Sequence, residues 1–181
     1  SLPQPDCAVC SPQYSCSGLP SGGSPDSYNE IEAGIQWIGN LSEYCINEET
    51  VVIVGHSAGD HLALLADIEF PNSDAVAGLG EITDIVTYAA GTNDCETATL
   101  LLRVSAFALA KELYQKADPV GLNLHSRSQL FHGTVDSIVN VSQSILANAT
   151  TSGLTEAGDF DWVNSGMEAF QLLTGSLEKL F

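Results

Sequence analysis

The clearest structural pattern in this chain is the segment Val51-Val52-Ile53-Val54-Gly55-His56-Ser57-Ala58-Gly59-Asp60-His61-Leu62-Ala63-Leu64-Leu65. Its four leading β-branched residues predict a strand buried on both faces, and the apolar residues after Gly59 recur at helical spacing. Between these halves stands a G-x-S-x-G motif, whose glycines allow a strand and a helix to pass close together at a sharp turn. The segment therefore predicts a strand, a tight turn and a helix, with Ser57 at the turn.

Ser57 is a candidate nucleophile. A serine at such a turn has a strained backbone, and its hydroxyl projects above the carboxyl-terminal edge of the sheet. The N-terminus of the following helix offers the Ala58 N–H group and the positive end of the helix dipole to a developing oxyanion. We therefore interpret Ser57 as a nucleophile and Ala58 as one oxyanion donor. The alternative is a glycine-containing turn in an unrelated α/β protein.

Length, composition and charge narrow the class of protein. The chain has 181 residues, of which 44% are hydrophobic, and this predicts one domain over 1–181 with a sizeable core. The 23 acidic residues against 5 Lys and Arg give a formal net charge of -18, which repels nucleic-acid phosphates and anionic lipid headgroups. We therefore expect no nucleic-acid or membrane partner. No signal peptide or membrane-length apolar run is recognised, so the compartment, secreted or cytoplasmic, stays open.

The cysteines do not predict a metal site. There are five, at Cys7, Cys10, Cys16, Cys45 and Cys95. Cys7 and Cys10 have C-x-x-C spacing, but neither a second such pair nor a nearby histidine pair accompanies them, as a zinc site would require. A buried thiol or a local disulfide is the expectation for this pair.

Strand and helix patterns alternate along the chain. Strands are expected at 7–11, 51–54, 75–80 and 129–133, with a weaker one at 154–160. Helices are expected from Pro25 to about Cys45, after Gly59, and at 141–151 and 165–181, and the segment 84–116 is expected to contribute a small cap over the site. This alternation predicts a mostly parallel sheet flanked by helices on both faces.

Four segments together resemble one known superfamily. They are Gly55-His56-Ser57-Ala58-Gly59 with His61-Leu62-Ala63, then Gly80-Glu81-Ile82-Thr83-Asp84-Ile85, Ala117-Asp118-Pro119, and 131–144. The chain resembles the α/β-hydrolase superfamily, specifically small carboxylesterases related to kynurenine formamidase and the hormone-sensitive-lipase-like esterases. The resemblance implies a serine ester hydrolase that forms an acyl-enzyme on small acyl esters, without metal or cofactor. It leaves the acyl group, the alcohol and the oligomeric state open.

The same resemblance implies a role for Asp136, which stands in Phe131-His132-Gly133-Thr134-Val135-Asp136. In the family the aspartate of this segment is the acid member of the catalytic triad. The chain order, serine before aspartate, agrees with that assignment. The alternative is an aspartate that only forms a turn after Gly133 and Thr134.

The expected general base is missing. In the family a histidine follows the acid, in a motif that reads His-Phe-Asp in many members, whereas here Gly158-Asp159-Phe160-Asp161-Trp162 stands at that place. Asp159 thus occupies the histidine position. A carboxylate there would face Asp136, and two adjacent carboxylates raise one another's pKa instead of making a good base.

Three interpretations of the missing base stay open. We prefer the first, in which Asp159 is an engineered change, a natural loss or a misread residue, because histidine and aspartate codons differ by one nucleotide. In the second, His132 or His125 serves as the base, although His132 follows a buried strand and is expected to be a hydrogen-bonded core residue. His56 and His61 are expected to be structural. In the third, the protein is a catalytically impaired relative that acts as a binding or structural protein.

The family's oxyanion loop is also missing. In the family a His-Gly-Gly stretch follows a strand that lies in the sheet between the 7–11 strand and the Ser57 strand, and this chain has neither the stretch nor that strand. We expect a sheet lacking these N-terminal strands. Either the chain is part of a longer protein, which we favour, or 16–24 has taken over the task, or the sheet is rearranged.

Overall fold

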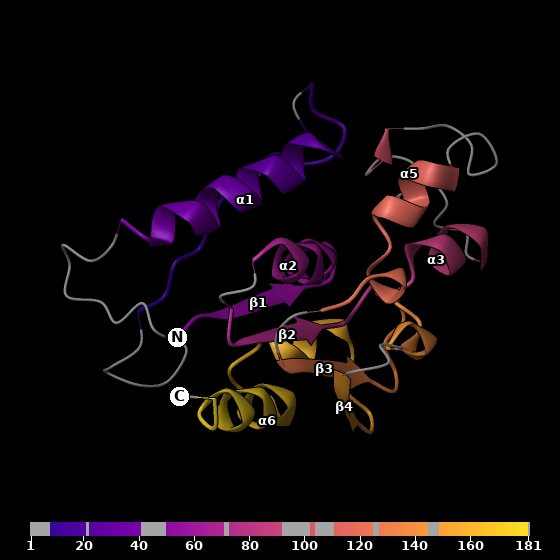
Figure 1. Ribbon diagram of the computed structural model, residues 1–181. Helices are drawn as coiled ribbons and strands as arrows, with labels where there is room; N and C mark the ends of the chain where they lie inside the picture. Colours follow the sequence, from indigo (N-terminus) through magenta and orange to yellow (C-terminus); the bar gives the residue numbers. More distant parts are fainter. Residues whose placement is uncertain are drawn as a thin grey trace.

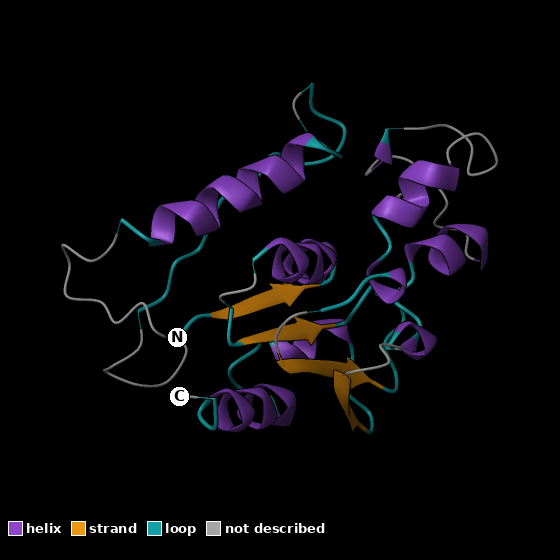
Figure 2. Ribbon diagram, in the orientation of Figure 1, coloured by secondary structure: helices purple, strands orange, loops and turns teal. Residues whose placement is uncertain are grey.

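A computed structural model describes residues 8–20, 22–40, 50–70, 73–91, 102–103, 111–124, 127–144 and 149–180. Its centre is a sheet of four parallel strands in the order β1-β2-β3-β4 (Figures 1 and 2). The strands are β1 Val52–His56, β2 Ala75–Leu79, β3 Arg127–Gly133 and β4 Ala149–Leu154. Parallel pairing places their carboxyl ends, including those of β1 and β3 that precede Ser57 and Asp136, at one edge of the sheet.

Helices cover both faces of the sheet (Figure 1). On one face lie α2 (Ala58–Glu69) and, outside it, α1 (Asp26–Ile38), while α6 (Glu168–Leu177) lies on the other. All five residues of β2 are buried, and Val76 packs with Ala63 and Leu64 of α2 whereas Leu79 packs on the opposite side with Leu173 of α6. The predicted fold class, a parallel sheet with helices on both faces, is therefore confirmed.

A third apolar cluster lies beyond the carboxyl ends of the strands. It joins α3 (Ile85–Gly91) and α5 (Lys111–Lys116) to the loop after β3, through the buried side chains Ile82, Ile85, Tyr88, Tyr114 and Val139. The turn η3 (Pro119–Gly121) follows α5. α3 and α5 are the ends of the expected cap over 84–116, whose middle, apart from residues 102–103, lies outside the described residues, so the cap stays a prediction.

Four element predictions are wrong in detail. The first helix begins at Asp26 after Pro25 and ends at Ile38 instead of near Cys45, because Gly39 and Asn40 are poor helix formers. Residues 8–11 form no strand. The predicted helix over 141–151 is a short turn, η4 (Val141–Gln143), followed after an interval by the start of β4. The strand expected at 154–160 is instead β4 ending at Leu154, followed by the turn η5 (Asp159–Trp162).

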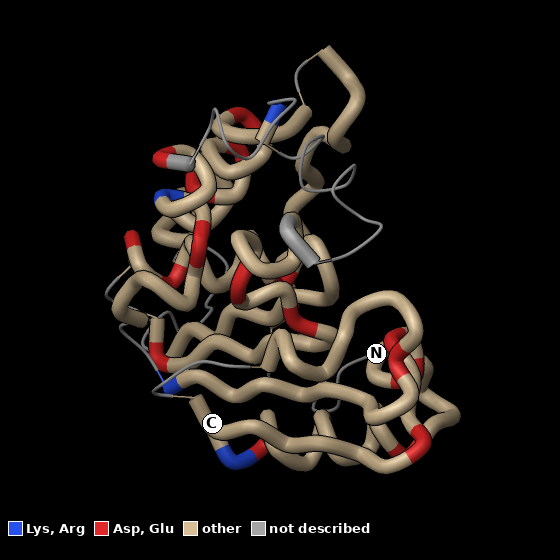
Figure 3. Tube along the Cα trace, turned by 90° about the vertical axis from the view of Figure 1, so that its right-hand side faces the viewer, with Lys and Arg blue, Asp and Glu red and all other residues tan. Residues whose placement is uncertain are grey.

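Acidic residues occur at many points along the trace and basic ones at few (Figure 3). Cys10 and Cys16 are exposed and free, so the expectation of a buried thiol or disulfide is wrong for Cys10, while Cys7 lies outside the described residues. Within the described ranges, no helix has the length and apolar character needed to cross a bilayer.

Candidate active site

Ser57 lies at a strained turn between β1 and α2. Its backbone angles are φ 54° and ψ −118°, outside the regions that non-glycine residues ordinarily occupy. The Ser57 N–H group donates to the Leu79 carbonyl oxygen at 2.8 Å, which fixes the turn to the end of β2. The side chain is half-buried, and Ala58 follows as the exposed first residue of α2, where an N–H group has no acceptor within the helix.

The close contact between the β1 and α2 backbones requires a glycine at position 55. A Cβ at Gly55 would collide with the Gly59 carbonyl oxygen and lie 2.5 Å from the Asp60 Cα, so strand and helix backbones touch here. We expect Gly55→Ala to destabilise the protein by about 3 kcal/mol, because backbone atoms must move. Gly175→Ala is the matched control, since a Cβ there, in the last turn of α6, meets nothing within 4 Å.

Urea unfolding of the two glycine variants checks this prediction. The Gly175 variant is expected to be more stable than the unmodified chain by about 0.5–1 kcal/mol, since alanine is the better helix former. Equal stability of the two variants would mean that the strand and the helix have room to separate at Gly55.

The two carboxylate oxygens of Asp136 have different surroundings. Its Oδ1 atom accepts hydrogen bonds from the N–H groups of Ile138 and Val139, both at 2.8 Å. Its Oδ2 atom is buried, lies 3.3 Å from His132 Nε2 and has no hydrogen-bond partner. The loop after β3 therefore fixes the carboxylate through Oδ1 and leaves Oδ2 available to a further donor.

Asp159 brings a second carboxylate to the same place. A Cβ built on Gly80, just after β2, would collide with Asp159 Oδ1 and lie 3.6 Å from Asp136 Oδ2, so both atoms crowd one point. Asp159 Oδ1 is buried without a hydrogen-bond partner, at 3.3 Å from His56 Nε2. Burial raises the pKa of Asp159 and the Asp136 charge raises it further, against the lowering effect of His56 and His132.

The histidines have distinct surroundings. His132 is fully buried, with Nδ1 2.6 Å from Glu81 Oε2 and Nε2 3.0 Å from the Val139 carbonyl oxygen, so the prediction of a hydrogen-bonded core residue is confirmed. His61 is buried as well, with Nδ1 3.2 Å from the Ile82 carbonyl oxygen, and burial lowers the pKa of its ring to about 4. His125 lies outside the described residues.

The sequence matches one protein-family model over most of its length. A family model, BD-FAE, matches residues 1–150. The chain belongs to the BD-FAE family, an α/β-hydrolase family. The comparison with curated proteins gave no match.

Solved structures share the fold at low sequence identity. A truncated carbohydrate esterase from gut microbiota is 17% identical with a TM-score of 0.74, over 87% of this chain and 69% of that one. The esterase Est2 of Thermogutta terrifontis is 16% identical with a TM-score of 0.67, over 92% and 68%. An acylaminoacyl peptidase of Pyrococcus horikoshii is 16% identical with a TM-score of 0.70, over 85% of this chain but only 27% of the peptidase.

Three residues at the site of this BD-FAE chain were not singled out from the sequence. Glu81 and Ser144 contact His132, with Ser144 Oγ 2.7 Å from His132 Nδ1. Asp60, in the first turn of α2, is fully buried, and its Oδ2 accepts from the Ile82 N–H group at 3.2 Å. The sequence signals for Glu81 are its place directly after a buried strand and Gly80 and its presence in one of the segments that resemble the superfamily.

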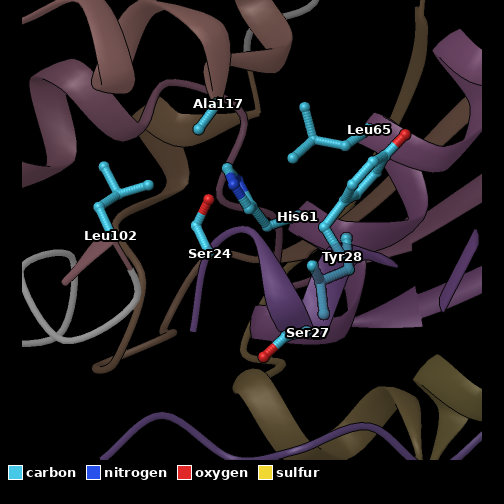
Figure 4. A pocket seen from close by; sticks show the side chains of 8 residues that line it. Ser24, Ser27, Tyr28, His61, Leu65, Leu102 and Ala117 are labelled. Atoms are coloured by element: carbon cyan, nitrogen blue, oxygen red, sulfur yellow. The ribbon is translucent and has the colours of Figure 1, made fainter. Parts of the chain in front are cut away.

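A small pocket lies elsewhere on α2, apart from this constellation (Figure 4). His61 faces it from α2, Ser24 and Tyr28 from the region of α1, and Leu102 and Ala117 from the opposite side. Ser57, Asp136 and Asp159 do not line it. The pocket is therefore separate from the site formed by Ser57, Asp136 and Asp159.

Proposed function

We propose that this chain carries the catalytic core of a serine carboxylic ester hydrolase that acts on small acyl esters through an acyl-enzyme. The observation that carries the proposal is the strained Ser57 turn at the sheet edge where Asp136 Oδ2, which accepts no hydrogen bond, also lies. Family membership supports the fold and the reaction class, and two of the solved structures with the same fold are esterases.

The proposed roles follow from the contacts of each group. Ser57 Oγ attacks the ester carbonyl, and the Ala58 N–H group at the start of α2 donates to the oxyanion that forms. Asp136 is the acid that orients the base, because its Oδ1 is fixed by backbone N–H groups while Oδ2 can accept an imidazole N–H. Position 159 is where that imidazole belongs.

With aspartate at position 159, the position proposed for the base carries no imidazole. We therefore expect only weak labelling of the chain by a fluorophosphonate probe at neutral pH, and none in Ser57→Ala. Intact mass of the labelled protein measures the adduct, and a heat-unfolded sample is the control for nonspecific reaction. Equal labelling with and without Ser57 would contradict the assignment of the nucleophile.

A second candidate is a binding or structural protein that keeps the hydrolase fold. The specific observation in its favour is the pair of carboxylate oxygens without hydrogen-bond partners, Asp136 Oδ2 and Asp159 Oδ1, where a base should stand. The strained Ser57 turn favours the enzyme, because such strain costs about 1–3 kcal/mol and serves no purpose in a purely structural turn. The response of position 159 to histidine separates the two candidates.

A further inference from the structure

His132 is surrounded on both sides by hydrogen-bond acceptors. On the Nδ1 side lie Glu81 Oε2 at 2.6 Å and Ser144 Oγ at 2.7 Å. The Ser144 hydroxyl donates its own hydrogen to Glu81 Oε2 at 2.8 Å, so it offers the ring only lone pairs. On the Nε2 side lie the Val139 carbonyl oxygen at 3.0 Å and Asp136 Oδ2 at 3.3 Å.

These neighbours fix the protons of the ring. A carbonyl oxygen can only accept, so Nε2 must carry a hydrogen, and Nδ1 faces a carboxylate and a hydroxyl oxygen, so it donates as well. Burial lowers the pKa of His132, but the hydrogen bond and charge of Glu81, the Val139 carbonyl and the Asp136 charge outweigh it and raise the pKa overall. These contacts therefore favour a ring that carries a hydrogen on both nitrogens.

The ring also holds the loop that carries Asp136. Val139 uses its N–H group to hold Asp136 Oδ1 and its carbonyl oxygen to accept from His132 Nε2. The same Nε2 lies 3.3 Å from Asp136 Oδ2. His132 thus contacts both ends of this loop and, at Glu81, the segment that follows β2.

We propose that His132, held by Glu81 and Ser144, is the positioning residue that keeps Asp136 in place with Oδ2 directed toward position 159. This rests on the proposed function, in which Asp136 is the acid member of the triad. His132 itself does not touch the substrate in this scheme. His132 stabilises the 136–139 loop through its hydrogen bond to Val139. Its positive charge also offsets the negative charges of Glu81, Asp136 and Asp159.

Nitrogen-15 NMR of the histidine rings tests the coupling without any activity. In the unmodified chain His132 is expected to be protonated on both nitrogens at pH 7.5. In Asp136→Asn, which keeps an oxygen for the two N–H groups, the pKa of His132 is expected to fall by about one unit. Asp74→Asn, at the opposite end of the sheet where Asp74 accepts from Val51, is the control and should leave it unchanged.

Esterase kinetics of His132 variants made in the Asp159→His protein are the second test of the positioning role. His132→Leu is expected to lower kcat by about 100-fold with little change in KM, because the acid loses its orientation. His132→Gln, which keeps an N–H donor on the side of Val139, should recover part of that loss. If His132 only filled space in the core, the kcat values of the two variants would be equal.

The NMR and kinetic experiments together distinguish failure of the His132 positioning role from failure of the proposed esterase function. A neutral His132 ring at pH 7.5, or an unchanged His132 pKa in Asp136→Asn, overturns the positioning role whatever the esterase assay gives. If Asp159→His is inactive but the His132 pKa falls in Asp136→Asn, the positioning of Asp136 holds and the proposed esterase function fails.

Discussion

Asp159→His is expected to raise the rate of ester hydrolysis by about 10³-fold or more, since a missing base or triad histidine costs between about 10² and 10⁶ in kcat. The expected gain follows from the positions of two carboxylate oxygens, one of Asp136 and one of Asp159. Asp136 Oδ2 is buried without a hydrogen-bond partner, and Asp159 Oδ1, which lies 3.3 Å from His56 Nε2, crowds the same point above Gly80. An imidazole at position 159 can donate an N–H group to Asp136 Oδ2 and turn its other nitrogen toward Ser57.

The control for this variant is Asp159→Asn. It removes the same negative charge from beside Asp136 but supplies no base, so it should relieve the repulsion between the carboxylates and leave hydrolysis near the level of the unmodified chain. Adding Ser57→Ala to the histidine variant should remove the gained activity. Hydrolysis of p-nitrophenyl acetate measures all four proteins at equal concentration.

The pH profile identifies the group responsible. Activity of Asp159→His should rise as pH increases through the pKa of the new imidazole, since only the neutral ring accepts the Ser57 proton. The unmodified chain has no such titrating base at position 159. Equal gains in activity from histidine and asparagine would show that charge repulsion, and not the lack of a base, limits the rate. No gain from histidine would contradict the assignment of position 159 as the place of the general base.

The Ser57 turn could be predicted from the sequence because its requirements are local. Gly55 and Gly59 are needed where strand and helix backbones touch, and both lie within two residues of Ser57. β4 could not be predicted, because Ala-Thr-Thr-Ser-Gly-Leu lies at the end of the sheet order, is nowhere fully buried and lacks an apolar alternation. Its β-branched Thr150 and Thr151 were the only local sign of a strand.

The surroundings of the site depend on contacts between distant parts of the chain. Only the resemblance to a known superfamily brought Asp136 and Asp159 together in advance. The hydrogen bond between Glu81 and His132 spans 51 residues of sequence and has no periodic signal. Asp60 looked like an ordinary acid in the first turn of a helix, a favourable position, and its burial became visible only when β2 and Glu81 were placed against it.

Asp60→Asn is expected to stabilise the protein at pH 7 by about 1–3 kcal/mol, the cost of leaving a buried polar group without a partner. Asp60 is fully buried, and its Oδ1 has no hydrogen-bond partner. Burial raises its pKa well above the usual value, and the Glu81 charge raises it further, against the Ile82 N–H bond. Asparagine keeps an acceptor for Ile82 and offers an amide donor on the side of Glu81, whose Oε1 is also without a partner.

The sign of the pH dependence follows from the raised pKa. Because the folded protein binds the Asp60 proton more tightly than the unfolded chain does, the carboxyl group favours folding most at low pH. Its contribution declines as pH rises above the unfolded pKa near 3.8 and stays low above the folded pKa. The stability advantage of Asp60→Asn should therefore be large at pH 7 and nearly absent below pH 4.

Urea unfolding at both pH values measures this difference. Glu112→Gln, which removes an exposed carboxylate from α5, is the control and should change stability by no more than about 0.5 kcal/mol at either pH. If Asp60→Asn is less stable than the unmodified chain at pH 7, then the Asp60 charge is compensated in the folded state. The pKa of Asp60 would then lie below that of the unfolded chain, and the account of this buried acid would be reversed.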